Sequence, residues 1–249
     1  MIRVRIIPVV LLQKGGLYKT VQFRNPVYVG DPINTVKIFN EKEVDELMIL
    51  DFSASVDQTE IDIPKLTEIA GEAFMPMSYG GAIRTFADAK KVLDAGYEKV
   101  VLNSVLFDRP GIIGEIAAVY GAQAVVAAID VKKNLFGKYK CYSFSGKKNT
   151  GWDPVDWALE LEKYGVGEIL VNSIASDGCW SGYDLNIISK IAAAVGIPVI
   201  ACGGACATED FKLAVEAGAS AVAAGSLFVF QKKRMGVLIN FPSGFKLLK

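Results

Sequence analysis

Three aspartates stand at or just beyond the ends of short apolar segments, where acid–base groups could act. Asp130 and Asp51 each close such a segment, and Asp177 lies in the sequence Ser-Asp-Gly. The chain contains no histidine, so acid–base work near neutral pH would fall to carboxylates, lysine or tyrosine. One aspartate at a strand end often only caps the next helix. Three at such positions favour a catalytic role for at least one, and we choose Asp130 because its apolar segment should raise its pKa.

Two glycine pairs follow apolar segments and could bind phosphate. In each case the next segment along the chain ends in a pair that contains a serine. The sets are Gly80-Gly81 with Asn103-Ser104, and Gly203-Gly204 with Gly225-Ser226. Glycine lets backbone N–H groups approach an anion closely, and a hydroxyl with free amides suits phosphate. Either pair alone could simply make a tight turn, but the duplication predicts two phosphate sites.

Four charged residues begin segments where the pattern expects apolar side chains. They are Arg5, Glu46, Lys99 and Glu168. One charge at such a position is usually solvated, whereas four of alternating sign could form a ring. A buried ring needs mutual pairing, and its cost suggests a function. Lys19 lies in a glycine-bearing segment that we interpret as a loop; it could close over a substrate, although an exposed lysine without a role explains the sequence almost as well.

The elements that would position these residues are short apolar segments alternating with amphipathic ones. Eight strands are predicted: Val4–Val10, Leu47–Asp51, Met75–Tyr79, Val100–Asn103, Val125–Asp130, Ile169–Ser173, Val199–Cys202 and Ala221–Gly225. Helices are predicted over Asp88–Ala95 and over Thr208–Ala217, the latter with Thr208 as its N-cap. Eight strands alternating with helices imply a parallel sheet closed into a (β/α)₈ barrel, an α/β fold whose active sites lie at the C-terminal ends of the strands.

An internal repeat supports this fold. Residues 76–82 align with residues 198–204 at an offset of 122, and the offset also relates Asp88 to Asp210, Ser104 to Ser226 and Glu46 to Glu168. Chance similarity between two units would not keep one register over several elements. We therefore expect two fused half-barrels within a single domain, residues 1–249.

Composition excludes several classes of protein. Twenty-seven basic residues balance twenty-seven acidic ones, so nucleic acid or an anionic membrane is not an expected partner. Arg3 and Arg5 interrupt the first apolar run, which argues against a signal peptide, and no membrane span is evident; a cytoplasmic protein is expected. The four cysteines form no Cys-x-x-Cys pair, so reduced thiols are expected, without a metal or a cofactor.

The residues named above resemble the synthase (cyclase) subunit of imidazole glycerol phosphate synthase along most of the chain. The matching stretches include Arg5–Pro8, Gly80–Arg84, Ala128–Asp130, Ser145–Gly151, Ser176–Gly178, Gly182–Asp184, Cys202–Ala205 and Ala224–Ser226. The resemblance implies a phosphate-binding barrel of the ribulose-phosphate type. It implies that a separate glutaminase subunit docks at the N-terminal face of the barrel and that ammonia passes through the barrel to a bisphosphorylated substrate.

The resemblance also implies roles for individual residues. Arg5, Glu46, Lys99 and Glu168 correspond to the charged gate of the ammonia channel. Asp130 corresponds to one of two catalytic aspartates, with Lys19, Asp51, Asp177 and Ser145 in supporting positions. The implied phosphate-binding residues are Gly81, Ala82, Asn103, Ser104, Asp177, Gly178, Gly203, Gly204, Gly225 and Ser226, where Ala82 replaces a glycine of the family.

One departure from the family concerns catalysis. The first of the two catalytic aspartates falls on Leu11, and leucine can neither give nor accept a proton, so cyclase activity should fall by orders of magnitude. Paralogues with similar segments, such as Asn25–Asp31 and Val237–Pro242, are associated with bacterial surface-polysaccharide (lipopolysaccharide) synthesis. There the glutaminase and barrel supply ammonia to a sugar amidotransferase that makes an acetamidino sugar.

Four functional hypotheses follow. The first is an ammonia-channelling subunit of a glutamine amidotransferase for sugar amidination, with cyclase activity reduced or lost. The second is a cyclase–lyase of histidine biosynthesis that makes imidazole glycerol phosphate and an aminoimidazole carboxamide ribotide. The third is a sugar-phosphate isomerase without a partner, and the fourth is a scaffold that only binds the glutaminase. Leu11 favours the first over the second.

Overall fold

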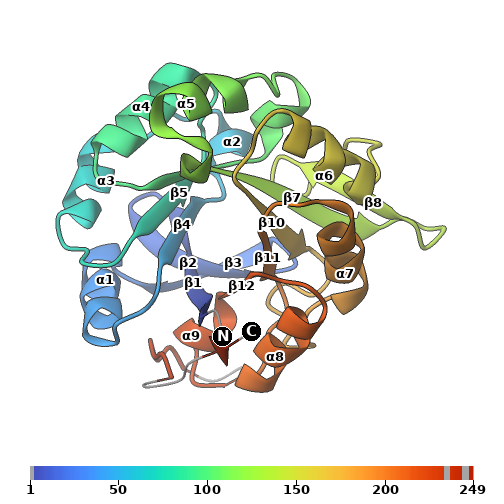
Figure 1. Cartoon of the computed structure of the whole chain (residues 1–249). Coiled ribbons are helices and arrows are strands. Elements are labelled where there is room, and N and C mark those ends of the chain that lie inside the picture. The colour runs from blue at the N-terminus through green and yellow to red at the C-terminus, as the bar shows by residue number, and fades with distance from the viewer. Residues whose placement is uncertain (1–2, 233–235, 243–246, 249) are drawn as a thin grey trace.

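Eight parallel strands close into a barrel in the computed structural model, which describes residues 3–232, 236–242 and 247–248. Hydrogen bonding passes from strand to strand around the barrel, and β10 (Glu168–Ser173) pairs with β7 (Val125–Lys133) to complete the circle. Figure 1 looks along the barrel, with strands at the centre and helices in an outer ring. The predicted (β/α)₈ barrel is therefore confirmed, although parts of both ends of the expected domain lie outside the described residues.

All eight predicted strands are present, with ends displaced by at most three residues. The other six are β1 (Arg3–Gln13), β4 (Leu47–Asp51), β5 (Met77–Gly80), β6 (Lys99–Leu102), β11 (Val199–Cys202) and β12 (Ala221–Ala224). The strands β1 and β7 run past their predicted ends because each continues into an antiparallel hairpin. These hairpins use β2 (Gly16–Val21), β3 (Arg24–Gly30), β8 (Tyr139–Ser143) and β9 (Lys148–Asn149). A short strand, β13 (Leu247–Leu248), pairs with the start of β1.

Helices cover the outside of the barrel. They are α1 (Pro32–Glu41), α2 (Ala54–Asp57), α3 (Ile63–Ala70), α4 (Phe86–Asp94), α5 (Ile112–Tyr120), α6 (Pro154–Lys163), α7 (Leu185–Ala194), α8 (Thr208–Glu216) and α9 (Ser226–Val229), with 3₁₀ turns η1 (Ser104–Phe107) and η2 (Ala122–Ala124). Asp31, Asp62 and Asp153 each cap a helix whose first turn contains proline, the residue best suited to that position.

Two helix starts differ from the prediction. The helix predicted from Asp88 begins earlier, because Thr85 and Asp88 exchange hydrogen bonds with each other's backbone N–H groups in a capping box. Thr208 is not an N-cap but the first residue of α8. The carboxylate of Asp210 instead accepts hydrogen bonds from the N–H groups of Cys206 and Ala207, so the acidic residue in the first turn caps this helix.

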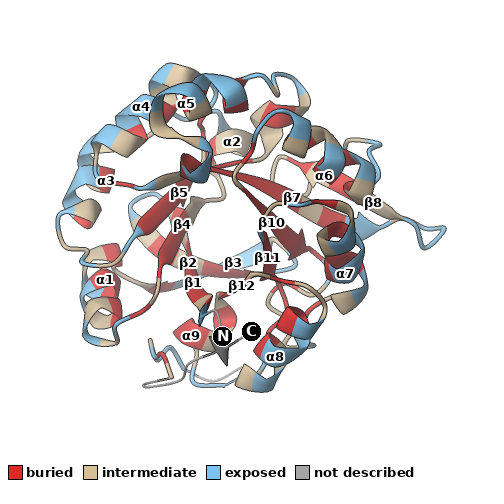
Figure 2. Ribbon diagram, in the orientation of Figure 1, coloured by how far each residue is buried: buried red, intermediate tan, exposed pale blue. Residues whose placement is uncertain are grey.

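Two apolar cores hold the barrel together. The larger one lies between the strands and the helices, and the smaller one fills the barrel with residues such as Ile7, Met48, Val126 and Ile200. Figure 2 shows the strands of the barrel largely buried and the outward faces of the helices exposed. Side chains at alternate positions of each strand therefore point into the barrel, and their sequence determines the lining from one end to the other.

The structure repeats with the predicted offset. The bounds of α1 and α6, of α4 and α8, and of η1 and α9 each differ by 122 residues. The offset of 122 does not hold along the first strand of each half, so the equivalent residues there are identified from strand pairing. Leu11 pairs with Leu50 in β4, while Asp130 pairs with Asn172 in β10. Since Leu50 and Asn172 are related by the common offset, Leu11 is the counterpart of Asp130.

Candidate active site

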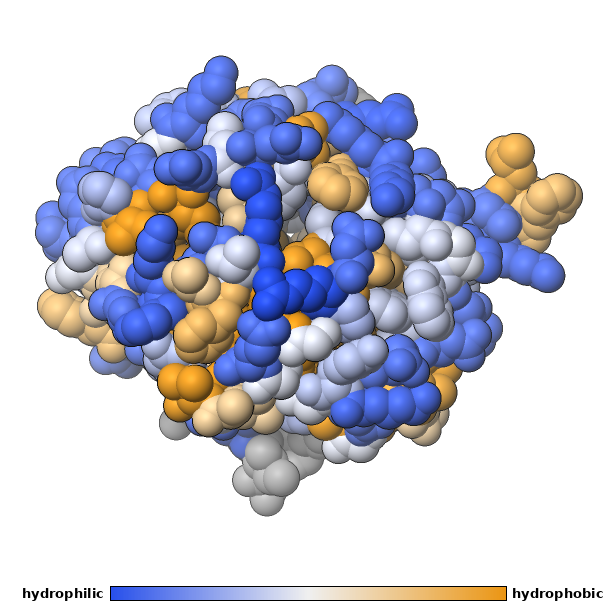
Figure 3. Space-filling view, turned by 90° about the horizontal axis from the view of Figure 1, so that it is seen from above, coloured by the Kyte–Doolittle hydropathy of each residue, from blue (hydrophilic) through white to orange (hydrophobic). Residues whose placement is uncertain are grey.

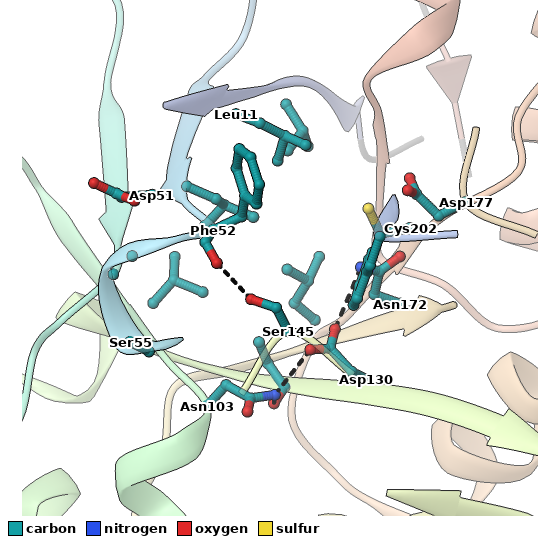
Figure 4. A pocket seen from close by; sticks show the side chains of 18 of the residues that line it. Leu11, Asp51, Phe52, Ser55, Asn103, Asp130, Ser145, Asn172, Asp177 and Cys202 are labelled. Carbon is teal, nitrogen blue, oxygen red and sulfur yellow. Dashed lines mark hydrogen bonds between the residues drawn. The ribbon is translucent and has the colours of Figure 1, made fainter. Parts of the chain in front are cut away.

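A cavity of about 370 Å³ opens at the C-terminal ends of the strands. Residues from all eight barrel strands line it, including Leu11, Asp51, Asp130, Asn172 and Cys202. Figure 4 shows Leu11 and Asp130 on opposite sides of this cavity, which we call the mouth. The register explains this placement, because the two residues occupy equivalent positions in the two halves of the barrel.

Two amides hold the carboxylate of Asp130. Asn103 Nδ2 donates a hydrogen bond to Oδ2 at 3.2 Å, and Asn172 Nδ2 donates to Oδ1 at 3.3 Å. Burial raises the pKa of Asp130 to about 7, although the hydrogen bond from Asn172 opposes this and the nearby charge of Asp177 adds to it. Asp130 can therefore exchange a proton near neutral pH. Leu11 offers no such group on the opposite side.

Asp51 and Asp177 make structural contacts around the mouth. Asp51 Oδ1 accepts hydrogen bonds from Ser53 and from the N–H group of Ala54. Asp51 therefore has the capping role that an aspartate at a strand end often has. Burial raises the pKa of Asp51, and these hydrogen bonds oppose the increase. Asp177 Oδ1 lies 2.9 Å from Lys19 Nζ in a buried ion pair.

Lys19 differs from its predicted setting. The segment expected to be a loop is the strand β2, and the lysine side chain is only 6% exposed. The interpretation of an exposed lysine without a partner is therefore wrong. Its ammonium group lies beside Asp177, and its side chain passes Gly225 so closely that an added Cβ there would meet Lys19 Cε at 3.1 Å. Lys19 is thus positioned next to one predicted phosphate site.

The loop after β8 crosses the mouth. Phe144 N–H donates to Ser104 Oγ at 2.9 Å, and Ser145 Oγ donates to the carbonyl oxygen of Phe52 at 2.5 Å; Figure 4 marks the second bond. Phe144 and Ser145 both have positive φ, at 51° and 53°, which costs energy in residues with side chains. This loop therefore ties β8 to the ends of β4 and β6.

The glycines of the predicted phosphate sites lie at the mouth, and two of them are required by packing. Gly81 has φ 137°, and a Cβ there would lie 2.7 Å from the Cβ of Asp51. Gly204 has φ 113° and packs against the backbone of Gly182. Ala82 adopts φ 52°, and its N–H donates to Ser55 Oγ at 3.4 Å. The tight turns alone therefore explain why glycine is present at these positions. Phosphate binding would be an additional use of the same backbone.

The remaining residues predicted for phosphate lie in two groups around the mouth. Asn103 and Ser104 stand at the end of β6, on the side covered by the loop after β8. Gly203, Gly225 and Ser226 line the other side, together with Asp177 and Gly178. The structure therefore brings together all ten predicted phosphate residues at one cavity, in the two groups that the repeat implies.

A four-membered charge ring closes the opposite end of the barrel interior. Arg5 lies 2.5 Å from Glu46 and 2.8 Å from Glu168, while Lys99 lies 3.0 Å and 3.1 Å from the same two carboxylates. Burial opposes the charge of Arg5, but its hydrogen bonds and attraction to Glu168 and Glu46 raise its pKa. The predicted ring is present, with each cation contacting both anions.

Three buried oxygen atoms along the barrel interior lack hydrogen-bond partners in the part of the chain that the structure describes. They are Glu46 Oε1 in the ring, Ser78 Oγ next to it, and Asn172 Oδ1 at the mouth. Ser78 pairs in register with Lys99 of the ring and with Met48, which lies two residues beyond Glu46. Buried polar atoms without partners are uncommon in native proteins, and each needs an explanation.

The described residues contain no cluster of three cysteine, aspartate or glutamate side chains arranged to hold a metal ion. Cys141, Cys202 and Cys206 are free thiols, and burial raises the pKa of Cys202 to about 12. Within the described ranges, no helix is both long and apolar enough to cross a membrane.

Residues 5–234 match the model of the family described as "Histidine biosynthesis protein". The chain is 47% identical to a Pseudomonas aeruginosa protein named "Putative imidazole glycerol phosphate synthase subunit hisF2", over 99% of both chains. It is 40% identical to the imidazole glycerol phosphate synthase subunit HisF of Alkaliphilus metalliredigens, over 93% of this chain and 92% of the relative. The HisF subunit of Streptomyces coelicolor is 39% identical over 94% and 93%, respectively.

Proposed function

The chain belongs to the histidine biosynthesis protein family, and from this premise we propose that it is an ammonia-channelling subunit of a glutamine amidotransferase, with cyclase activity reduced or lost. One observation carries the loss of cyclase activity. The position equivalent to Asp130 in the other half of the barrel holds Leu11, so only one of these two equivalent positions carries a carboxylate, where a reaction needing both would have a pair.

The lining of the barrel supports ammonia transfer. Uncharged ammonia can cross an apolar interior, whereas ammonium would pay a large desolvation cost. The ring of Arg5, Glu46, Lys99 and Glu168 closes one end, and apolar side chains such as Ile7, Val101 and Leu170 continue to the mouth. We propose that a glutaminase docks at the ring face. The ring also favours a subunit that provides a path for ammonia over a sugar-phosphate isomerase without a partner.

The mouth supports a phosphorylated ligand. Two groups of glycine and serine residues face each other across it, and Lys19 supplies a cation beside the group that contains Gly225. Such a pair of sites suits a molecule with two phosphate groups or one long phosphorylated molecule. These sites favour a ligand-binding subunit over a scaffold that binds only the glutaminase.

We propose that the acceptor of the ammonia is a sugar, modified by a third enzyme in surface-polysaccharide synthesis. This part depends on the resemblance of Asn25–Asp31 and Val237–Pro242 to the paralogous branch. The second candidate function is a working cyclase–lyase of histidine biosynthesis. The clamp of Asn103 and Asn172 on Asp130 favours it, because one well-placed group with a pKa of about 7 could serve as both acid and base.

Cyclase turnover distinguishes the two functions. The purified chain is supplied with ammonium and the bisphosphorylated aminoimidazole carboxamide ribonucleotide, and loss of the substrate is followed. We expect little turnover by the natural chain. Leu11→Asp restores the second carboxylate, so turnover should rise by about 100-fold or more, the usual contribution of positioned proton transfer.

Leu50→Asp is the matched control, because it places a carboxylate on the neighbouring strand at the same height without restoring the pair. Leu11→Asn shows whether a polar residue at this position is tolerated in the folded state. Turnover by the natural chain close to that of an ordinary synthase subunit would contradict the proposed loss and make the second function correct.

A further inference from the structure

The hairpin of β7 and β8 carries an unusual concentration of positive charge. Between Asp130 and Asp153 the sequence contains six lysines and no acidic residue, although the whole chain is neutral. The six are Lys132, Lys133, Lys138, Lys140, Lys147 and Lys148. A local charge of this size attracts an acidic surface and repels a basic one.

These lysines have no carboxylate counterions within the part of the chain that the structure describes. No ion pair joins any of the six to a carboxylate of the described residues. Lys133 lies over the ring of Tyr139 and Lys148 over the ring of Phe144, at 4.8 Å and 5.9 Å from the ring centroids. Lys140 donates to the carbonyl oxygen of Gly151. Their positive charge is therefore available to a partner molecule.

The tip of the same hairpin is apolar. Leu135 is 102% exposed and Phe136 is 87% exposed. The turn that presents them is hydrogen-bonded: Asn134 Oδ1 accepts from the N–H groups of Phe136 and Lys138. The hairpin extends beyond the outline of the barrel at the side of β8 (Figure 1), and an apolar projection stands out from hydrophilic surface there in Figure 3.

The hairpin is also connected to the mouth. Its first strand contains Asp130, which pairs in register with Tyr142 of β8. The loop that leaves β8 crosses the mouth, where Phe144 contacts Ser104 and Ser145 contacts Phe52. A molecule that binds the hairpin would therefore stand beside the mouth and hold the strand pair from which the crossing loop extends.

We propose that the hairpin is the docking element for the enzyme that accepts the ammonia, and that this enzyme presents an acidic surface with an apolar notch. Leu135 and Phe136 would fill the notch, and the six lysines would face its carboxylates. The inference rests on the proposed function, which requires such an acceptor at the mouth. A protein is favoured over an anionic lipid surface because two side chains give little insertion into a bilayer, whereas a compact apolar anchor ringed by charge is typical of protein interfaces.

Binding of the purified acceptor enzyme to the full chain, in complex with its glutaminase, tests the proposal by calorimetry. Reversal of three hairpin charges, Lys132→Glu with Lys133→Glu and Lys138→Glu, should weaken binding about 100-fold at low salt and remove most of its salt dependence. Leu135→Ser with Phe136→Ser should weaken it about tenfold or more. The matched control reverses three exposed lysines elsewhere, Lys91, Lys212 and Lys232, and should change binding less than threefold, roughly the scale of surface charges outside an interface.

The outcomes separate this inference from the proposed function. Nitrogen transfer from glutamine to the acceptor by the natural complex tests the proposed function alone. If transfer and binding survive in both hairpin variants as in the control, the docking element is wrong and the proposed function stands. If the natural complex binds the enzyme without transferring nitrogen, loss of binding in the hairpin variants still supports the docking element.

A vesicle experiment tests the lipid alternative. Vesicles of phosphatidylcholine containing about one third phosphatidylglycerol are sedimented with the natural complex and with the Leu135→Ser/Phe136→Ser variant. We expect neither to sediment at physiological salt. Sedimentation of the natural complex that is lost in the variant, together with unchanged binding of the acceptor enzyme, would overturn the inference in favour of a membrane surface.

Discussion

At the scale of single residues, opposing effects determine the charge of Asp130. Burial disfavours the carboxylate, while the amides of Asn103 and Asn172 favour it by donating hydrogen bonds. The result is a pKa of about 7, because burial is the largest effect. The ordinary value for an aspartate in the unfolded chain is far lower. Folding therefore takes up a proton at this residue between about pH 4 and pH 7.

This proton uptake predicts how stability depends on pH. A group whose pKa is higher in the folded state stabilises that state at low pH, and the advantage is lost as pH rises through about 7. Asp130→Asn removes the titrating group and keeps its shape. The free energy of unfolding of the variant, relative to that of the natural chain, should increase by about 2 kcal/mol between pH 4.5 and pH 8. The full pKa shift would correspond to about 4 kcal/mol, which is discounted because Asp130 is only half-buried.

Denaturant unfolding of both chains at the two pH values measures this difference, and other titrating groups cancel in the comparison. Leu11→Asn is the control, since it changes the equivalent position without removing an acid. A constant difference between Asp130→Asn and the natural chain across this range would show that Asp130 titrates at its ordinary pKa.

At the scale of elements, a buried ion pair and two hydrogen bonds hold the β2–β3 hairpin against the loop after β10. Lys19 Nζ lies 2.9 Å from Asp177 Oδ1, and Gln22 donates to backbone carbonyls of the loop after β10 through both its N–H and its side chain. Lys19→Met should destabilise the chain by about 3 kcal/mol, because it leaves a buried carboxylate without its partner. Lys19→Met with Asp177→Asn should recover most of that loss. Amide hydrogen exchange should be fastest in β2 and β3 of the single variant; equal stability of the single and double variants would contradict this account.

The elements themselves could largely be predicted from the sequence, because the strand segments are short, apolar and evenly spaced. Val199–Cys202 is found as predicted. The extension of β1 could not be predicted, since it depends on pairing with β2, which resembles a glycine-bearing loop in sequence. The cap of α8 was misassigned because Thr208 and Asp210 are both good capping residues, and only the geometry selects between them.

The candidate site could be predicted only in part. Asp130 and the charge ring follow from unusual residue types at the ends of apolar strands. Asn172 was missed, although a polar residue at an inward position of an apolar strand is a usable signal. The contact of Ser145 with Phe52 joins residues 93 positions apart, and no local pattern encodes a contact of that kind. The ion pair of Lys19 was missed for the same reason.

At the scale of the whole molecule, the barrel connects two chemically different ends. The charge ring lies where the strands begin, and Glu168 and Asn172 belong to the same strand, which separates ring and mouth by about 13 Å. The oxygens without partners belong to Glu46 in the ring, Ser78 beside the ring residue Lys99, and Asn172 at the mouth. An ammonia molecule has three N–H donors, so each oxygen could receive one during passage. The proposed passage of ammonia would therefore account for these buried acceptors without partners among the described residues, each of which otherwise costs about 1–3 kcal/mol.

Ser78 gives the most direct test of passage through the barrel, because its side chain is fully buried next to the ring. Ser78→Val adds bulk and removes the hydroxyl, so nitrogen transfer from glutamine in the complete assembly should fall about tenfold or more, since extra volume in a packed interior has little room to relax. Transfer from added ammonium should be unchanged, because that ammonia enters at the mouth. Ser78→Ala removes the hydroxyl without adding bulk, and an intermediate effect on the glutamine-driven rate would show that the hydroxyl itself assists passage. A glutamine-driven rate that is unchanged in Ser78→Val would show that ammonia does not pass this position, whereas a joint decline with both sources of nitrogen would show that the substitution has damaged the mouth or the fold.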